Sequence, residues 1–259
     1  MSDTTRVRHL VHAAVVAPIS PIRYQDGMAD EPAAYDHVAD AYSRILDRDG
    51  VGLVDPILEE LLGDVADQEV LSLACGQGQD ARMLARLGAR VIGIDVSTEM
   101  LRHALAHETA SPRGIRYVEG DAQRLAGFDD ASFDGVLCHM ALMDIPELAP
   151  TIRSVERVLR GGGWFVFSIV HPAYHPHVEI ISDYLVDHSY AKTRPVDWLP
   201  LRAYHRPLSA YVDALGRSNL RIERFVEAHQ QSRSDSVENR AERDAGKVPG
   251  LLYVRATKR

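Results

Sequence analysis

The amino-acid sequence predicts a doubly wound α/β fold, in which helices cover both faces of a mostly parallel sheet. Two observations support this prediction. From residue 70 onward, short continuous apolar runs alternate with segments of helical periodicity, which is typical of parallel strands buried on both faces. The chain has 259 residues, of which 46% are hydrophobic and 25% charged, so it is long enough to bury a sizeable core.

A helical segment precedes this alternation. In residues 33–46, apolar and aromatic side chains recur at steps of three and four, which indicates one face of a helix. A second helix is expected to begin at Asp55, a capping residue followed by proline, and to end at Gly63. We therefore expect residues 1–64 to form an N-terminal segment and helical cap, ahead of a main domain in residues 65–259.

The main domain is expected to alternate strands with helices. The predicted strands comprise residues 70–74, 90–95, 115–119, 133–138, 164–170, 220–228 and 251–257. The predicted helices comprise residues 80–87, a helix capped by Ser97, residues 147–160 with a stop at Gly161, Gly162 and Gly163, and residues 207–216. Residues 171–207 break the alternation and are predicted to form a lid insertion over one edge of the sheet, and the charged residues 232–247 a solvated loop.

The composition disfavours two classes of partner. Lys and Arg number 29 against 37 Asp and Glu, a net charge of −8, whereas proteins that bind nucleic acid through phosphate contacts are usually basic. No apolar run approaches the roughly 20 residues that a membrane-spanning helix needs. The two cysteines, Cys75 and Cys138, form neither a disulfide framework nor a zinc motif, so we expect a cytoplasmic protein without nucleic-acid or membrane partners.

Small and acidic residues follow the first three predicted strands, at the edge where an open parallel sheet binds its ligands. The segment 74–78 (Ala-Cys-Gly-Gln-Gly) follows the first strand, and its small residues let a ligand approach the backbone at the start of a helix. The second strand ends in Asp95, a carboxylate suited to accept hydrogen bonds from two ribose hydroxyls. Asp121 follows the third strand and is suited to accept from an exocyclic amine such as that of adenine.

The glycines also fit a relaxed dinucleotide-binding pattern, Gly76-x-Gly78-x-x-Ala81, with Asp95 downstream. A nicotinamide-dependent oxidoreductase is therefore an alternative. Three features favour another function. The pattern lies behind a long helical N-terminal segment, Asp121 adds an adenine contact, and the end of the chain predicts two strands joined by a polar loop.

Taken together, these segments resemble the class I S-adenosylmethionine-dependent methyltransferases, in particular the small-molecule type 11 subgroup near the ubiquinone-biosynthesis methyltransferases. The matching motifs, in order, are residues 70–78 (VLSLACGQG), 91–101 (VIGIDVSTEML), 120–122 (GDA), 133–137 (FDGVL) and 158–163 (VLRGGG). The resemblance covers about residues 35–259. It implies a Rossmann-like sheet of seven strands with a terminal antiparallel strand.

The resemblance implies that S-adenosyl-L-methionine is the cofactor and gives roles to residues at matching positions. The implied cofactor contacts are Ala74, Cys75, Gly76 and Gly78 along the methionine part, Asp95 on the ribose, Val96 and Met100 beside adenine, Gly120, Asp121 and Ala122 at its amino edge, Tyr42 in a covering segment, and His139 with Cys138 near the reacting centre. One position departs from the family, which usually has an acid where this chain has Ser72. That acid helps to hold the methionine ammonium, so this charge is expected to be weaker or supplied elsewhere.

The implied reaction is in-line methyl transfer to a small molecule, with oxygen favoured over nitrogen or carbon as the acceptor. His139 and His171 follow the fourth and fifth strands and are candidate general bases, although each also suits a role in shaping the pocket. His205 is a further candidate. Asp144 is expected to cap the helix that is entered through Pro146.

No metal is expected, because His171, His175 and His177 lie on a proline-containing segment without a neighbouring carboxylate cluster. Aromatic residues that are candidates to line an acceptor pocket are Tyr24, Tyr42, Tyr174, Tyr184, Trp198 and Tyr204. Two further functions stay open. One is an enzyme that binds the same cofactor but catalyses a non-methylating reaction such as cyclisation, and the other is a non-catalytic binding module.

Overall fold

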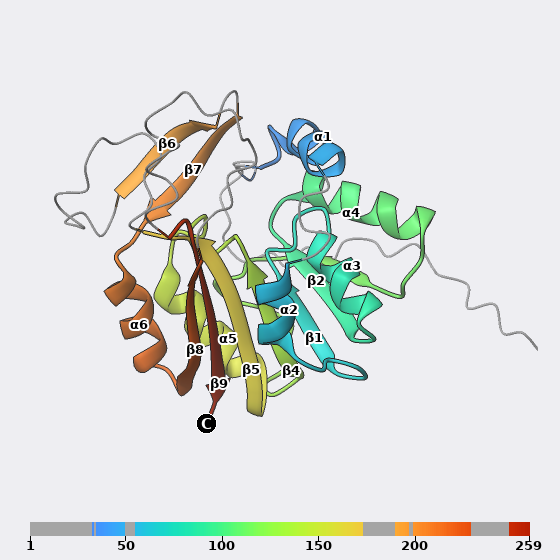
Figure 1. Cartoon of the computed structure of the whole chain (residues 1–259). Coiled ribbons are helices and arrows are strands. Elements are labelled where there is room, and N and C mark those ends of the chain that lie inside the picture. Colours follow the sequence, from blue (N-terminus) through green and yellow to red (C-terminus); the bar gives the residue numbers. More distant parts are fainter. Residues whose placement is uncertain (1–32, 34, 50–54, 173–189, 197–198, 229–248) are drawn as a thin grey trace, which may run out of the picture.

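The computed structural model describes residues 33, 35–49, 55–172, 190–196, 199–228 and 249–259. A central sheet carries helices on both faces (Figure 1). The predicted α/β fold is confirmed.

Seven strands of the described residues form this sheet, in the order β3-β2-β1-β4-β5-β9-β8. The strands are β1 (Glu69–Leu73), β2 (Arg90–Asp95), β3 (Arg116–Glu119), β4 (Phe133–His139), β5 (Leu159–Val170), β8 (Leu220–Ala228) and β9 (Leu251–Lys258). Strands β1 to β5 pair in parallel, whereas β9 runs antiparallel to both β5 and β8, as predicted. The strand order reverses between β1 and β4, and the loops that follow two such strands diverge to leave room for a ligand.

Local capping signals start two helices where the sequence predicts them. Asp55 precedes α2 (Pro56–Leu62), and its Oδ1 accepts hydrogen bonds from the N–H groups of Ile57 and Leu58, both at 3.1 Å. Ser97 caps α4 (Thr98–Ala110) by accepting at Oγ from Met100 N at 3.1 Å. The remaining helices of the described residues are α1 (Ala39–Asp49), α3 (Gln79–Arg86), α5 (Leu148–Val158) and α6 (Leu208–Gly216). Across the described ranges, no helix is both long enough and apolar enough to cross a bilayer.

Two hydrophobic layers hold the helices against the sheet. On one face α2, α3 and α4 pack around buried residues such as Leu58, Leu84 and Leu101. On the other face α5 and α6 pack around residues such as Ile152 and Leu215. Because each fully buried side chain of this size stabilises the fold by about 1.5–3 kcal/mol, the sheet is a firm support for the loops at its edges.

The glycine run after α5 lies within a strand, so the prediction that it stops the helix is wrong. Helix α5 ends at Val158, and β5 begins at the next residue, Leu159. The pairing of β4 with β5 shifts register between Phe133 and Gly135. Gly135 pairs with Trp164, and a Cβ added to Gly135 would lie 2.0 Å from Trp164 Cε2. The glycine run therefore falls in the irregular part of this pairing, where small residues let the two strands approach.

The predicted lid insertion contains a two-stranded antiparallel sheet that the sequence did not indicate. It pairs β6 (Tyr190–Val196) with β7 (Leu199–His205). At the end of β7, Tyr204 N donates to the carbonyl oxygen of Met143 at 2.6 Å, which attaches the insertion to the loop after β4. In Figure 1 this small sheet and α1 lie at the end of the molecule where β1 and β5 terminate. Residues 173–189 of the insertion and the predicted solvated loop at 232–247 lie outside the described residues.

Candidate active site

Two neighbouring strands end in left-handed backbone at the carboxyl edge of the sheet. Ala74 follows β1 with a φ of +51°, and Met140 follows β4 with a φ of +53°. This conformation is uncommon in residues other than glycine and is concentrated at functional sites. Gly76 and Gly78 continue the first loop with φ of +53° and +81°. Three N–H groups of this loop, those of Cys75, Gly76 and Gly78, already donate within the fold, to Ile94 O, Asp95 Oδ2 and Cys75 O.

The glycine loop packs directly on side chains beneath it. A Cβ added to Gly78 would lie 2.2 Å from Tyr117 Oη, and one added to Gly76 would lie 3.1 Å from Met100 Cε. Met100, which the resemblance puts beside adenine, is only 3% exposed in this position under the loop. The loop therefore needs glycine both for its backbone conformation and for the space it occupies.

Asp95 ends β2 and joins two loops through its carboxylate. Its Oδ2 accepts from Gly76 N at 2.7 Å, and its Oδ1 accepts from Ser97 N at 2.9 Å. Burial raises the pKa of Asp95, and these backbone donors partly offset the rise. Since an ionised carboxylate has about four acceptor positions, the two bonds leave capacity for the hydroxyls of a ribose.

The loops after β2 and β3 lie side by side and combine an apolar surface with an acceptor. Val96 is 40% exposed, an unusual exposure here for a large apolar side chain, and it suits contact with a flat base. The N–H of Gly120 donates to the main-chain oxygen at the end of β2 at 2.9 Å. Asp121 accepts at Oδ1 from the backbone N–H and side-chain amide of Gln123, at 2.8 and 3.0 Å. Ala122 packs, partly buried, against the core.

Neither cysteine at this edge is a nucleophile. Cys75 and Cys138 are 7% and 0% exposed, and burial raises the pKa of both thiols, so each stays protonated near neutral pH. Ser72 is 2% exposed on β1 and carries no charge. At this position, therefore, β1 supplies no charge to a ligand.

The N-terminal segment covers this edge through two aromatic residues. Tyr35 and Tyr42 pack edge to face, with ring centroids 5.5 Å apart. Tyr35 Oη donates to Asp144 Oδ2 at 2.9 Å, and Asp36 Oδ1 accepts from Ser97 Oγ at 2.6 Å. The segment thus contacts both the loop after β4 and the start of α4. Burial raises the pKa of Tyr42 to about 12.

The prediction that Asp144 caps a helix is wrong. Glu147 occupies the position before α5, and the Asp144 carboxylate turns instead toward Tyr35. The same loop is held from the other side by Arg206, whose guanidinium donates to the carbonyl oxygens of Leu142 and Ile145 at 3.2 and 2.6 Å. Burial raises the pKa of Asp144 to about 7, although the hydrogen bond from Tyr35 and the charge of Arg206 oppose the rise.

Asp80 is a site residue that the sequence did not single out. It lies in the first turn of α3, directly behind the glycine loop. Burial raises its pKa, and its charge in turn affects Tyr42, Cys75 and Cys138, which come from three other elements of this edge. An acid just after a glycine loop was the available signal, but first-turn acids are common for helix-dipole reasons alone.

The two candidate bases occupy different places. His139 ends β4, where its Nδ1 lies 2.6 Å from Ser168 Oγ and its ring stacks on Tyr253 at 6.4 Å. His171 follows β5, is 3% exposed, and its Nε2 lies 2.9 Å from Glu227 Oε1 on β8. Only His139 is at the reversal point between β1 and β4.

Several predicted acceptor contacts lie outside the described residues, namely Tyr24, Tyr174, Tyr184 and Trp198, as do His175 and His177, which were considered as metal ligands. The backbone of His205 is described within β7, but its side chain is not. Tyr204 is half-buried, with the Arg206 guanidinium 5.1 Å from its ring centroid. In the part of the chain that the structure describes, no three His, Cys, Asp or Glu side chains are placed to hold a metal ion.

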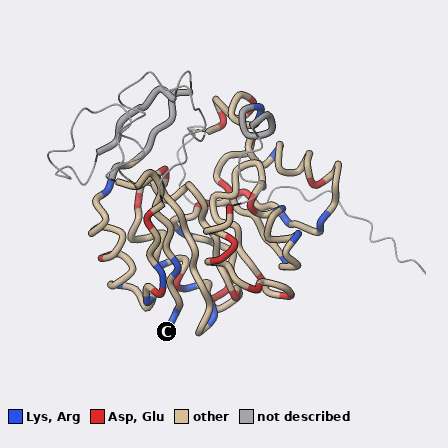
Figure 2. Tube along the Cα trace, viewed as in Figure 1, with Lys and Arg blue, Asp and Glu red and all other residues tan. Residues whose placement is uncertain are grey.

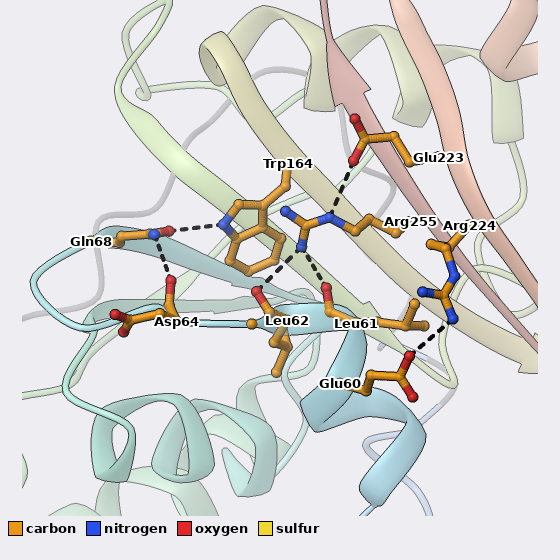
Figure 3. Close-up of a pocket in the computed structure, with 10 residues that line it drawn as sticks. Glu60, Leu61, Leu62, Asp64, Gln68, Trp164, Glu223, Arg224 and Arg255 are labelled. Atoms are coloured by element: carbon orange, nitrogen blue, oxygen red, sulfur yellow. Dashed lines mark hydrogen bonds and ion pairs between the residues drawn. The ribbon is translucent and has the colours of Figure 1, made fainter.

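The opposite, amino edge of the sheet is a different kind of surface. Basic residues gather there near the C-terminus (Figure 2). A groove runs between the end of α2 and strands β8 and β9 (Figure 3). In it Arg224 pairs with Glu60 at 2.9 Å, and Arg255 donates to the carbonyl oxygens of Leu61 and Leu62. These groups satisfy one another, so we assign the groove to packing.

Known proteins match both the sequence and the fold. Residues 71–167 match the type 11 family described as a methyltransferase domain. A ubiquinone biosynthesis O-methyltransferase of Albidiferax ferrireducens is 36% identical over 138 residues, which is 49% of this chain and 54% of the relative. The enzyme of the same name from Paracidovorax citrulli is 37% identical over 112 residues, 42% of this chain and 47% of the relative. The chain thus spans about half the length of these curated relatives.

Solved structures match over a larger part of the chain. The S-adenosylmethionine-dependent methyltransferase from Mesorhizobium loti has a TM-score of 0.65 and 30% identity, and the match covers 81% of this chain and 99% of that one. The [4+2]-cyclase SpnF has a TM-score of 0.61 at 18% identity, over 90% of this chain and 99% of that one, a likeness of fold alone. The chain therefore belongs to the class I S-adenosylmethionine-dependent methyltransferases, and its cofactor is S-adenosyl-L-methionine.

Proposed function

We propose that the protein transfers a methyl group from S-adenosylmethionine to a small-molecule acceptor, and that the acceptor atom is a hydroxyl oxygen. The observation that carries the proposal is the convergence of the left-handed loop at residues 74–78, Asp95 and His139 at the reversal point of the sheet. The names of the curated relatives, which are O-methyltransferases, support oxygen as the acceptor. We also propose a cytoplasmic location, because Cys75 and Cys138 are free thiols, which are typical of a reducing compartment.

The proposal divides the cofactor among the residues of this edge. The loop at 74–78 lies along the methionine part, and Asp95 accepts from the ribose hydroxyls. Val96 packs on adenine, and Asp121 accepts from its amino group. Tyr42 covers the cofactor from the N-terminal side. When bound, the cofactor supplies an electrophilic methyl group on a sulfonium sulfur.

Methyl transfer from a sulfonium is a displacement with a good leaving group. The protein therefore mainly has to orient the acceptor against the methyl group and to exclude water. Orientation alone is worth up to about 7–11 kcal/mol of the barrier in well-aligned systems. The half-buried pair of Tyr35 and Tyr42 supports both roles, because its rings pack together beside the site and Tyr35 is hydrogen-bonded to Asp144 in the loop after β4. The insertion supports them from the other side, through Tyr204 and Arg206.

His139 is our candidate for the group that receives the acceptor's proton. When its Nδ1–H donates to Ser168 Oγ, the unprotonated Nε2 is left to act as the base. His171 remains a second candidate, with the weaker support of a ring that is buried against Glu227.

The test is transfer from methyl-labelled cofactor to a panel of hydroxyl, amine and carbon-acid small molecules. We expect label on a hydroxyl oxygen, and turnover lower by about 10²- to 10⁴-fold in His139→Asn than in the wild type. His171→Asn is the matched variant and is expected to retain most of the activity. Unlabelled conversion of an acceptor would point to the cyclase-like alternative, cofactor binding without any conversion to a binding module, and an equal loss in both variants would overturn the choice of His139.

A further inference from the structure

One serine interrupts an otherwise apolar stretch of β5, in the interior of the sheet. Residues 164–170 read Trp-Phe-Val-Phe-Ser-Ile-Val, and Ser168 is the single polar residue among them. Ser168 is 0% exposed. Because burying a hydroxyl without a hydrogen bond costs stability, a serine at this position needs a partner.

The partner of this hydroxyl is the imidazole of His139. Ser168 Oγ lies 2.6 Å from His139 Nδ1, and it also accepts from Met140 N at 3.1 Å. The same N–H donates to the main-chain oxygen of Ser168 at 3.0 Å, so the turn after β4 does not depend on the hydroxyl. The bond to the imidazole, by contrast, is made by the hydroxyl alone.

A third residue of the same row packs on the imidazole. His139 pairs with Ser168, and Ser168 pairs with Tyr253, so the three side chains share one face of β4, β5 and β9. The rings of His139 and Tyr253 stack with centroids 6.4 Å apart and an angle of 28° between their planes. Tyr253 is 3% exposed, and its Oη donates to Asp55 Oδ2 at 2.7 Å. The imidazole is therefore held by a fixed hydroxyl and packs on a fixed aromatic ring.

We propose that Ser168 is a positioning residue, which holds His139 through Nδ1 so that Nε2 is the nitrogen presented to the methyl acceptor. The proposal rests on the base of the proposed function and adds the group that orients it. In a histidine, the hydrogen bond that one ring nitrogen makes decides which nitrogen carries the proton. A hydroxyl suits this place because it can donate to Nδ1 or accept from Nδ1–H, so the bond persists when the imidazole gains or loses a proton.

The first test is spectroscopic and needs no acceptor. Long-range proton–nitrogen correlation spectra of the full chain, with S-adenosylhomocysteine added, report which ring nitrogen of His139 is protonated, and the spectrum of His139→Asn identifies the signal. We expect one neutral form to predominate in the wild type and both forms to be populated in Ser168→Ala. Ser168→Thr keeps a hydroxyl and is expected to restore the wild-type pattern. Identical patterns in the wild type and Ser168→Ala would overturn the proposal.

The second test is a double-mutant cycle, measured with the panel member that the wild type methylates. Ser168→Ala is expected to lower kcat by about 10- to 100-fold and to change KM for the cofactor by less than about two-fold, because it affects the base and not cofactor binding. Combined with His139→Asn, the same substitution should lower kcat by less than about two-fold further, because Ser168 acts through His139. Ser168→Thr is expected to recover most of the loss.

The matched control is Ser218→Ala, which removes a hydrogen bond of 2.7 Å from a serine hydroxyl to the carbonyl oxygen of Leu215, at the end of α6 and outside the site. It is expected to leave both the spectrum of His139 and kcat unchanged. A loss in Ser168→Ala that adds in full to the loss in His139→Asn would overturn the positioning role but leave His139 as the base. Wild-type turnover in His139→Asn would instead overturn the base itself, and with it the role of Ser168.

Discussion

The two edges of the central sheet differ in how fully their charged groups are paired. At the amino edge, acids and bases pair with each other, as Arg224 does with Glu60 at 2.9 Å and Arg160 with Asp134 at 2.5 Å. At the carboxyl edge Asp121 lies 3.9 Å from Arg124 and Glu227 lies 2.9 Å from His171, but the partly buried Asp80, Asp95 and Asp144 form no ion pair with a described residue.

This difference separates a structural surface from a binding surface. Solvent-exposed pairs such as those of the amino edge contribute little stability each, and their groups are fully occupied. Desolvated carboxylates cost stability and retain acceptor capacity, so a fold keeps them where a ligand supplies the missing donors. We therefore do not expect the groove of Figure 3 to be a catalytic site, although it is concave and lined by charged residues.

The substitution Asp144→Asn at the carboxyl edge is expected to have the largest effect, which is on the free energy of unfolding. The folded-state pKa of Asp144 is about 7, raised by burial above an ordinary value near 4, so folding favours the protonated form. The contribution of this residue to stability is therefore present at low pH and is lost as pH rises from about 4 to 7. Asparagine does not titrate, so the variant should gain up to about 4 kcal/mol over the wild type between pH 4 and 8. Urea unfolding at both pH values measures this gain, and parallel pH profiles for the two proteins would contradict it.

A somewhat smaller effect is expected from Asp95→Asn. The amide keeps a single acceptor oxygen, which Gly76 N or Ser97 N engages, so the ribose hydroxyls lose a charged acceptor. We expect the affinity for S-adenosylhomocysteine to fall about 100-fold. The control is the 2′,3′-dideoxy form of the same ligand, which should bind both proteins alike. A preference for the hydroxylated ligand that survives in the variant would place the ribose elsewhere.

The smallest effect is expected at the amino edge. Arg224→Ala removes the pair with Glu60, whose side chains are 55% and 65% exposed, and should change the free energy of unfolding by less than about 1 kcal/mol. Affinity for S-adenosylhomocysteine should not change. A double-mutant cycle with Glu60→Ala measures the pair directly, and a loss of cofactor affinity in either variant would erase the distinction between the two edges.

The parts of the fold that local sequence determines were predictable. Asp55 and Ser97 are caps that act within their own turn, and continuous apolar runs distinguished the buried strands from the helices. The hairpin of β6 and β7 escaped prediction because residues 190–205 show no alternation of apolar and polar side chains. The glycine run before Trp164 was misread, because its role depends on a register shift opposite Gly135 on another strand.

In the candidate site, too, residues in local sequence motifs were predictable, whereas residues whose role depends on long-range packing were not. The glycine loop and Asp95 sit in motifs that the chain displays directly, and the fold brings them together through the 2.7 Å bond from Gly76 N. Asp80 and Asp144 owe their chemistry to what covers them, including Tyr35 and Tyr42 from a distant part of the chain. Burial of this kind leaves no local pattern, so it appeared only in the folded molecule.

The attachment made by Arg206 has a consequence for how such a protein diversifies. Its guanidinium reaches the carbonyl oxygens of Leu142, Ile145 and Pro146, and every amino acid offers such an oxygen. Substitutions of the side chains in the loop after β4 therefore leave these hydrogen bonds from Arg206 in place. Selection for a new acceptor can reshape the walls around the substrate while the framework that aligns the insertion is inherited unchanged.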